Sequence, residues 1–206
     1  MKTLKTLCVS LLTLCSLNVM ASDRLPTIAP GNYDSQQQAA AQSFLEARKT
    51  PVFGPFEPLM YSPEVMTLAR SMGDYLRYHS AIGNSLSEFA ILIVAREWTQ
   101  DYEWYVHYPI AIKTGLRLEV AEAIRDGRRP SAMTADEELV YAFSIELLKN
   151  HQVSDVTYTA AEKRFGKKGV IDLTGILGYY TFLAMQMNVA EYPLPEGTPR
   201  PFSSTR

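Results

Sequence analysis

Glu103 and His107 are the residues whose types and spacing most strongly indicate chemistry. They are four positions apart, so a helix would project both side chains from one face, about one turn apart. The flanking segments, residues 89–95 and 108–112, are mainly apolar. An acid and an imidazole in apolar surroundings are costly unless they are paired or used. A shielded carboxylate beside His107 would raise the pKa of the imidazole, which predicts a group able to transfer protons.

Ordinary structural roles compete with this interpretation. Glu103 and His107 could form a surface ion pair worth about 0.2–0.5 kcal/mol, or His107 could be a core residue bound to a backbone carbonyl. Glu88 also has two interpretations. In Ser85-x-x-Glu88 it fits the capping-box pattern of a helix start, whereas as a second acid it would face His107 from a neighbouring helix. The local pattern slightly favours the cap.

Arg96 is the candidate for binding a substrate carboxylate through a bidentate contact. If one helix runs on through Asp101, then Arg96 and the Glu103–His107 pair belong to one polar stripe. If Asp101 begins a new helix, the stripe is broken and Arg96 packs from the preceding helix. A solvated arginine is the alternative role. The other predicted substrate-binding residues come from the same segment: Gln100, Tyr102 and Trp104.

Several other kinds of site find no support in the sequence. His79 and His151 have no acidic neighbours at the spacing of a metal site, and the Glu103–His107 pair has no evident third ligand. We therefore expect neither a metal nor a cofactor. No phosphate-binding glycine loop and no nucleophile elbow occurs, which argues against nucleotide-binding and serine-hydrolase functions.

The first 21 residues are typical of an export signal. Lys2 and Lys5 precede a short apolar stretch, residues 7–19, and Ala21 ends a segment that fits a cleavage site. The stretch is too short and too often interrupted by hydroxyl residues for a stable transmembrane helix. The sequence thus predicts cleavage and delivery to a bacterial periplasm, with no membrane attachment afterwards.

Cysteine content and charge restrict the function further. Cys8 and Cys15 are the only cysteines and both lie in the predicted signal, so the mature chain would have neither disulfides nor thiol redox chemistry. The chain has 22 acidic and 20 basic side chains, and cleavage would remove two lysines and no acid. A net negative charge argues against nucleic acid or an anionic membrane as the main partner. We expect a small-molecule substrate.

Capping residues, prolines and apolar periodicity predict an all-α chain that forms a single domain. Residues 22–53 are expected to form an arm and a first helix, residues 54–195 the main domain, and residues 196–206 a flexible tail. Residues 54–58 are expected to be a loop. The predicted helices span about residues 34–49, 63–76, 86–99, 101–114, 118–125, 134–150, 154–166 and 168–188.

Several motifs occur in a characteristic order along this domain. They are Gly54-Pro55-Phe56, Tyr61-Ser62-Pro63-Glu64, Glu88-x-x-Ile91-Leu92-x-Val94-Ala95-Arg96, Tyr102-Glu103-Trp104-x-x-His107, Ala111-x-x-x-Gly115, Ile124-x-x-Gly127 and Gly178-Tyr179-Tyr180 with Asn188. In these motifs the chain resembles the carboxymuconolactone decarboxylase-like family, which includes the alkylhydroperoxidase D type. The resemblance covers about residues 54–195. It implies a helical bundle assembled as a homo-trimer or hexamer.

The hydroperoxidase branch of that family has a glutamate, a Cys-x-x-Cys pair and a histidine four residues after the second cysteine. The corresponding positions here are Glu88, Gln100, Glu103 and His107. The proton-relay residues are present and the thiols are absent, so dithiol peroxidase (peroxiredoxin-like) activity is not expected. The chain is closer to the decarboxylase branch, a lyase type that relies on acid–base groups.

The resemblance therefore implies catalytic roles for His107, Glu103 and Glu88 on a small carboxylated or lactone-type substrate. His107 would deliver a proton to a developing carbanion, and Glu103 would orient its ring. Glu88 would be a relay, or only a cap. An export signal is unusual for an enzyme of cytoplasmic aromatic catabolism, and it leaves the substrate open. The alternative is a non-catalytic periplasmic binding protein that keeps the family fold.

Overall fold

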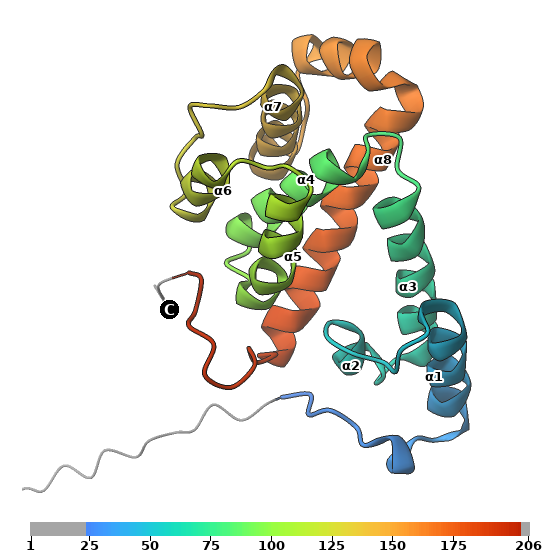
Figure 1. Ribbon diagram of the computed structural model, residues 1–206. Helices are drawn as coiled ribbons and strands as arrows, with labels where there is room; N and C mark the ends of the chain where they lie inside the picture. Colours follow the sequence, from blue (N-terminus) through green and yellow to red (C-terminus); the bar gives the residue numbers. More distant parts are fainter. Residues whose placement is uncertain (1–23, 203–206) are drawn as a thin grey trace, which may run out of the picture.

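The computed structural model describes residues 24–202, and the predicted signal peptide lies outside this range. The prediction of an all-α chain is confirmed: the described part contains helices and no strand (Figure 1). The helices are a short 3-10 helix η1 (Pro30–Asn32), α1 (Ser35–Arg48), α2 (Phe56–Leu59), α3 (Pro63–Tyr78), α4 (Asn84–Glu97), α5 (Asp101–Lys113), α6 (Leu118–Arg125), α7 (Ala135–Asn150) and α8 (Asp155–Ala190).

Most helix ends follow the local signals in the sequence. Asp34 caps α1 and Thr134 caps α7, each as part of a capping box, and the Ser154 side chain caps α8. Gly166 interrupts α8 with a φ of 70°, so two helical segments meet there at a kink. The prediction of a break between residues 166 and 168 is therefore confirmed.

Two local predictions are wrong. The capping box at Ser85-x-x-Glu88 does not form, because α4 begins earlier, at Asn84, after Gly83 with a φ of 80° and without a side-chain cap. Glu88 lies inside the helix and has other partners. The segment expected to be a loop at residues 54–58 contains the one-turn helix α2, whose Phe56 packs its ring at 5.1 Å from that of Phe44.

A turn between α4 and α5 decides between the two alternatives for the polar stripe. Thr99 adopts a left-handed φ of 48°, and α5 starts afresh at Asp101 with Gln100 as its N-cap. Arg96 therefore belongs to the preceding helix, on a different helix axis from Glu103 and His107. The continuous stripe is not formed.

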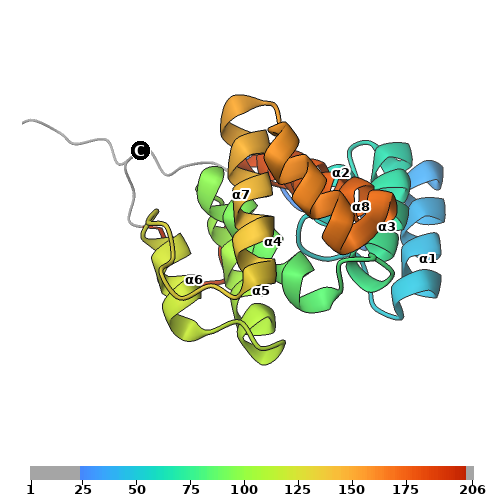
Figure 2. The ribbon, with the colours of Figure 1, turned by 90° about the horizontal axis from the view of Figure 1, so that it is seen from above.

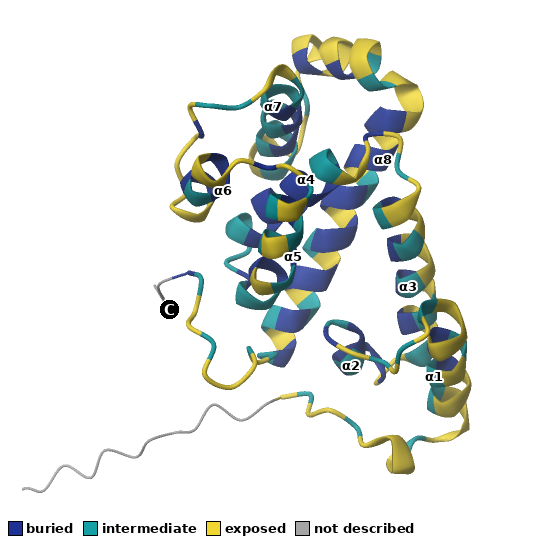
Figure 3. Ribbon diagram, viewed as in Figure 1, coloured by how far each residue is buried: buried dark blue, intermediate teal, exposed yellow. Residues whose placement is uncertain are grey.

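The core is built around α4. From Ser87 to Ala95 every residue of α4 is buried, because α5, α6, α7 and α8 pack around it. Figures 1 and 2 place α1 and α3 on one side of α8, and α5 and α6 on the other. Figure 3 shows the buried surface concentrated on α4 and on the inner face of α8. In residues 24–202, no helix has the length and apolarity needed to cross a membrane.

Candidate active site

Helices α4 and α5 bring two carboxylates and one imidazole together in the core. Glu88 lies on the buried part of α4, and Glu103 and His107 lie one turn apart on the face of α5 that packs against it. Their relative exposures are 0%, 3% and 4%. A surface ion pair, one of the ordinary roles considered for this histidine, is therefore excluded by burial.

Both ring nitrogens of His107 face a carboxylate oxygen. Nδ1 lies 2.6 Å from Oε2 of Glu88, and Nε2 lies 3.3 Å from Oε2 of Glu103. The edge of the Tyr180 ring, from α8, packs against the imidazole with the centroids 5.0 Å apart. The Nδ1 contact is the shorter, so Glu88 orients the ring more tightly than Glu103 does.

These contacts set the charge of His107. Burial by itself lowers the pKa of the imidazole. The hydrogen bonds with Glu103 and Glu88 and the negative charges of these residues raise it by more, so the pKa of His107 lies above its ordinary value of 6.5. The protonated ring can donate to both acids at once, which neither neutral tautomer can do. Arg77 adds a second cation, with Nε 3.6 Å from Oε1 of Glu88.

A cavity of about 40 Å³ lies beside His107 and Glu103. Its other lining side chains come from α1, α2, α3, α5, α8 and the segment before α2. The ones that bear on chemistry are Arg48, Phe53, Arg77, Tyr102, Tyr179 and Tyr180. Glu88 does not line it. Oε1 of Glu103 is buried and accepts no hydrogen bond from residues 24–202. Glu103 and the Nε2 edge of His107 are thus the groups that can contact a ligand. Glu88 contacts the other ring nitrogen, Nδ1, and does not reach the cavity.

Of the predicted substrate-binding residues, the structure brings one to this cavity. Tyr102 lines it. Arg96 lies in the last turn of α4 and lines a different cavity. Gln100 caps α5: its side-chain carbonyl accepts from the amide of Tyr102, and its side-chain amide donates to Asn188. The Trp104 ring is buried against the rings of Tyr108 and Phe202.

The structure also adds residues that the sequence analysis did not single out for this site. Arg77 lies in the last turn of α3, eleven positions before Glu88, so recognising the helical hairpin α3–α4 would have placed it there. Tyr179 and Tyr180 come from α8, far along the chain, and no local spacing points to them. Gly73 also lines the cavity, and its missing side chain leaves room for the Tyr179 hydroxyl.

Taken together, the residues define a buried acid–imidazole–acid relay that opens on a small, partly aromatic cavity. Such a relay can hold a proton on Nε2 and can donate it to, or recover it from, a bound molecule. Searches of protein-family models and of curated proteins found no match to the chain.

Proposed function

We propose that this protein is an acid–base enzyme that acts on a small carboxylated or lactone-type substrate by a decarboxylation or a related proton-transfer step. The observation that carries the proposal is the buried relay Glu88–His107–Glu103, of which His107 and Glu103 line the cavity. Oε1 of Glu103 is buried and has no hydrogen-bond partner among the described residues. Burying these charged groups costs desolvation, and a buried charged cluster adds little net stability to the fold. Contact with a ligand in the cavity would give the cluster a role.

The division of labour follows from the distances. Glu88, 2.6 Å from Nδ1, holds the imidazole in one orientation and favours its protonated form. When a substrate carboxylate leaves as CO₂, the electron pair of the broken carbon–carbon bond stays on the carbon. The proton on Nε2 of His107 is transferred there, and Glu103 stabilises the cation before transfer. From the sequence, Glu103 is expected to orient the ring. We assign that role to Glu88 instead, because its contact with the ring is the shorter.

Substrate size and charge are matched to the cavity. Arg77 and Arg48 line it, so one of them replaces Arg96 as the partner for a carboxylate. A volume of about 40 Å³ corresponds to a few water molecules. A ring-sized substrate therefore requires lining side chains to move, and Phe53, 41% exposed, is the one best placed to do so.

We further propose that the chain is a member of the carboxymuconolactone decarboxylase-like family and that it works in the periplasm. The all-helical fold is compatible with that family, and so is the contact between Glu88 and His107, the two relay positions that the resemblance singles out. In that resemblance, Gln100 and Glu103 correspond to the positions of the family's two thiols. Dithiol-dependent hydroperoxide turnover is therefore not part of this proposal.

The test is a screen of the mature protein against lactones and carboxylated ring-cleavage products, followed by CO₂ release and ultraviolet absorbance. For a substrate that turns over, His107→Gln should lower kcat by about 10²–10⁴-fold, the usual contribution of positioned proton transfer. Glu88→Gln should cost less and move the pH profile toward lower pH, because it removes the charge behind the ring.

His151→Asn, at an exposed left-handed position after α7, is the matched histidine control and should leave turnover unchanged. Turnover that survives the double change Glu103→Gln and His107→Gln would sink the proposal. A ligand that binds equally well to His107→Gln and is never converted would instead favour the non-catalytic binding role.

A further inference from the structure

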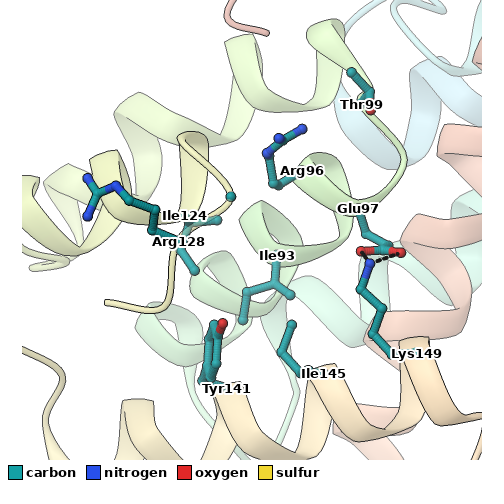
Figure 4. Close-up of a pocket in the computed structure, with 10 residues that line it drawn as sticks. Ile93, Arg96, Glu97, Thr99, Ile124, Arg128, Tyr141, Ile145 and Lys149 are labelled. Atoms are coloured by element: carbon teal, nitrogen blue, oxygen red, sulfur yellow. Dashed lines mark hydrogen bonds and ion pairs between the residues drawn. The ribbon is translucent and has the colours of Figure 1, made fainter. Parts of the chain in front are cut away.

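A second and larger cavity lies between α4, α6 and α7. Its volume is about 340 Å³, within the usual range for sites that bind small molecules. One part of the lining is apolar and aromatic, with Ile93, Ile124, Ile145 and Tyr141, and another part carries charges, with Arg96 and the Glu97–Lys149 ion pair (Figure 4). It shares no lining residue with the cavity beside His107.

Arg96 is the unusual member of this lining. Of the arginines in residues 24–202, it alone has no carboxylate oxygen within 4.0 Å. Its Nε is buried and donates no hydrogen bond to any residue that the structure describes. The guanidinium rests instead near the face of the Phe202 ring, 5.4 Å from the centroid. A buried guanidinium nitrogen without an acceptor is costly, and an anion would remove that cost.

The position of the Arg96 guanidinium is fixed by its packing. Gly127 follows α6 with a φ of 72°, and a side-chain carbon there would lie 3.0 Å from Nη2 of Arg96. The glycine therefore lets the backbone approach the guanidinium closely. With Phe202 near one side and Gly127 near another, the group is held before any ligand arrives, which lowers the entropic cost of binding.

The charges in the cavity favour an anion with a single charge. Lys149 is neutralised by Glu97, and Arg128 by Asp126. Figure 4 shows the Arg128 guanidinium turned away from the other side chains drawn. The positive charge of Arg96 is left over, in a cavity whose lining also includes Ile93, Tyr141 and Ile145.

We propose that this cavity is a binding site for a small organic monocarboxylate, whose carboxylate accepts hydrogen bonds from Arg96 and whose apolar or aromatic body packs on Ile93, Tyr141 and Ile145. A guanidinium and a carboxylate match in planar geometry, and the apolar wall selects against small inorganic anions. The site is separate from the proposed catalytic cavity, so it does not depend on the proposed function.

The probe is benzoate, titrated calorimetrically into the mature protein, with benzamide as the neutral molecule of nearly the same shape and inorganic phosphate as an anion without an apolar body. Benzoate should bind saturably at about millimolar concentration or below. Benzamide and phosphate should bind at least about ten-fold more weakly, because benzamide lacks the negative charge and phosphate lacks the apolar body.

Arg96→Gln should weaken benzoate binding by about ten-fold or more, the usual effect of losing a charge-assisted hydrogen bond. Arg164→Gln, which changes an exposed arginine that pairs with Asp136 and does not line the cavity, is the matched control and should change it by less than about two-fold. Arg96→Lys, which keeps the charge and loses the fork, should bind with intermediate affinity and replaces the glutamine variant if that one does not fold.

His107→Gln should bind benzoate as the wild type does, which separates this site from the catalytic proposal. Equal binding of benzoate and benzamide, or benzoate affinity unchanged in both Arg96 variants, would overturn the inference. So would benzoate binding that is lost in His107→Gln and kept in Arg96→Gln.

Discussion

A histidine held between two buried carboxylates is the central feature at the scale of residues. Glu88, His107 and Glu103 together carry one net negative charge when the ring is protonated, and Arg77 approaches Glu88 to balance it. Buried charge networks of this kind seldom add net stability, because the desolvation of each ion offsets most of the attraction. Their presence here therefore supports the proposal of proton chemistry made above.

The coupling of His107 protonation to folding gives a prediction. Because its pKa in the folded state is raised above 6.5, the folded protein holds this proton more tightly than the unfolded chain does. The stabilisation is complete below about pH 6.5 and is lost as the pH rises through the folded-state pKa. The free energy of unfolding from urea titrations should therefore fall with pH in this window.

His107→Gln should abolish that fall, and His79→Gln, which changes an exposed ring at the end of α3, should retain it. An unfolding free energy in the wild type that is flat or rising across the same window would contradict the assignment of a protonated His107.

At the scale of elements, the sequence predicted what depends on local physics. Most helices begin where a capping side chain or a proline precedes an apolar face, as at Thr134 and Pro63. The failure at Ser85-x-x-Glu88 has a physical reason: the same glutamate that could cap a helix end finds partners in His107 and Arg77 once α3 and α5 pack against α4. Local spacing cannot show which of these interactions prevails.

The residues of the candidate site also fall into those that local spacing predicts and those that tertiary packing brings in. Glu103 and His107 are neighbours through helix geometry alone, so their spacing was enough to find them. Arg96 was assigned to the same site on the assumption of proximity along the chain, and the turn at Thr99 separates it. Tyr180 reaches His107 from a helix that begins almost fifty residues later, a contact that tertiary packing creates.

The packing of α3 on α8 gives a prediction at this scale. A side-chain carbon at Gly73 would lie 2.3 Å from the Tyr179 hydroxyl oxygen and 2.7 Å from its ring carbon. Tyr179 is buried and its ring is rigid, so the helices must separate or the ring must move. Gly73→Ala should destabilise the protein by about 1–3 kcal/mol in urea unfolding, and should also disturb the cavity that Tyr179 lines.

Gly178 on α8 is the matched control, because a side-chain carbon there meets nothing within 4 Å. Gly178→Ala should be neutral or should stabilise the protein by about 0.5–1 kcal/mol, the usual gain from replacing a helix glycine. If both variants are equally stable, the close contact between Gly73 and Tyr179 is not part of the folded state.

At the scale of the whole molecule, one buried helix supports both cavities. Glu88 in the first half of α4 acts on the cavity beside His107, and Arg96 in its last turn lines the cavity shared with α6 and α7. The two cavities share no lining residue, so a change in one is not expected to alter the other directly. This separation is what makes the two proposals independently testable.

The outer face of α3 suggests how copies of the chain would associate. Val65, Leu68, Met72 and Tyr75 recur at intervals of three, four and three, which places them on one face, and they are 40%, 72%, 47% and 42% exposed. Exposed apolar faces of this kind often mark protein contacts. We propose that α3 contributes to the interface of a closed homo-oligomer, a trimer or hexamer as the family resemblance implies.

Sedimentation velocity at micromolar concentration should show this assembly for the mature wild type. Leu68→Glu should shift it to smaller species, because a charge would be buried in the apolar contact. Val156→Glu, which changes a residue 80% exposed in the first turn of α8, should leave the distribution unchanged. A wild type that sediments as a monomer would rule out the assembly. An assembly that survives Leu68→Glu would show that the interface does not involve this face of α3. A contact centred on α3 would be disrupted by a glutamate at its most exposed apolar position.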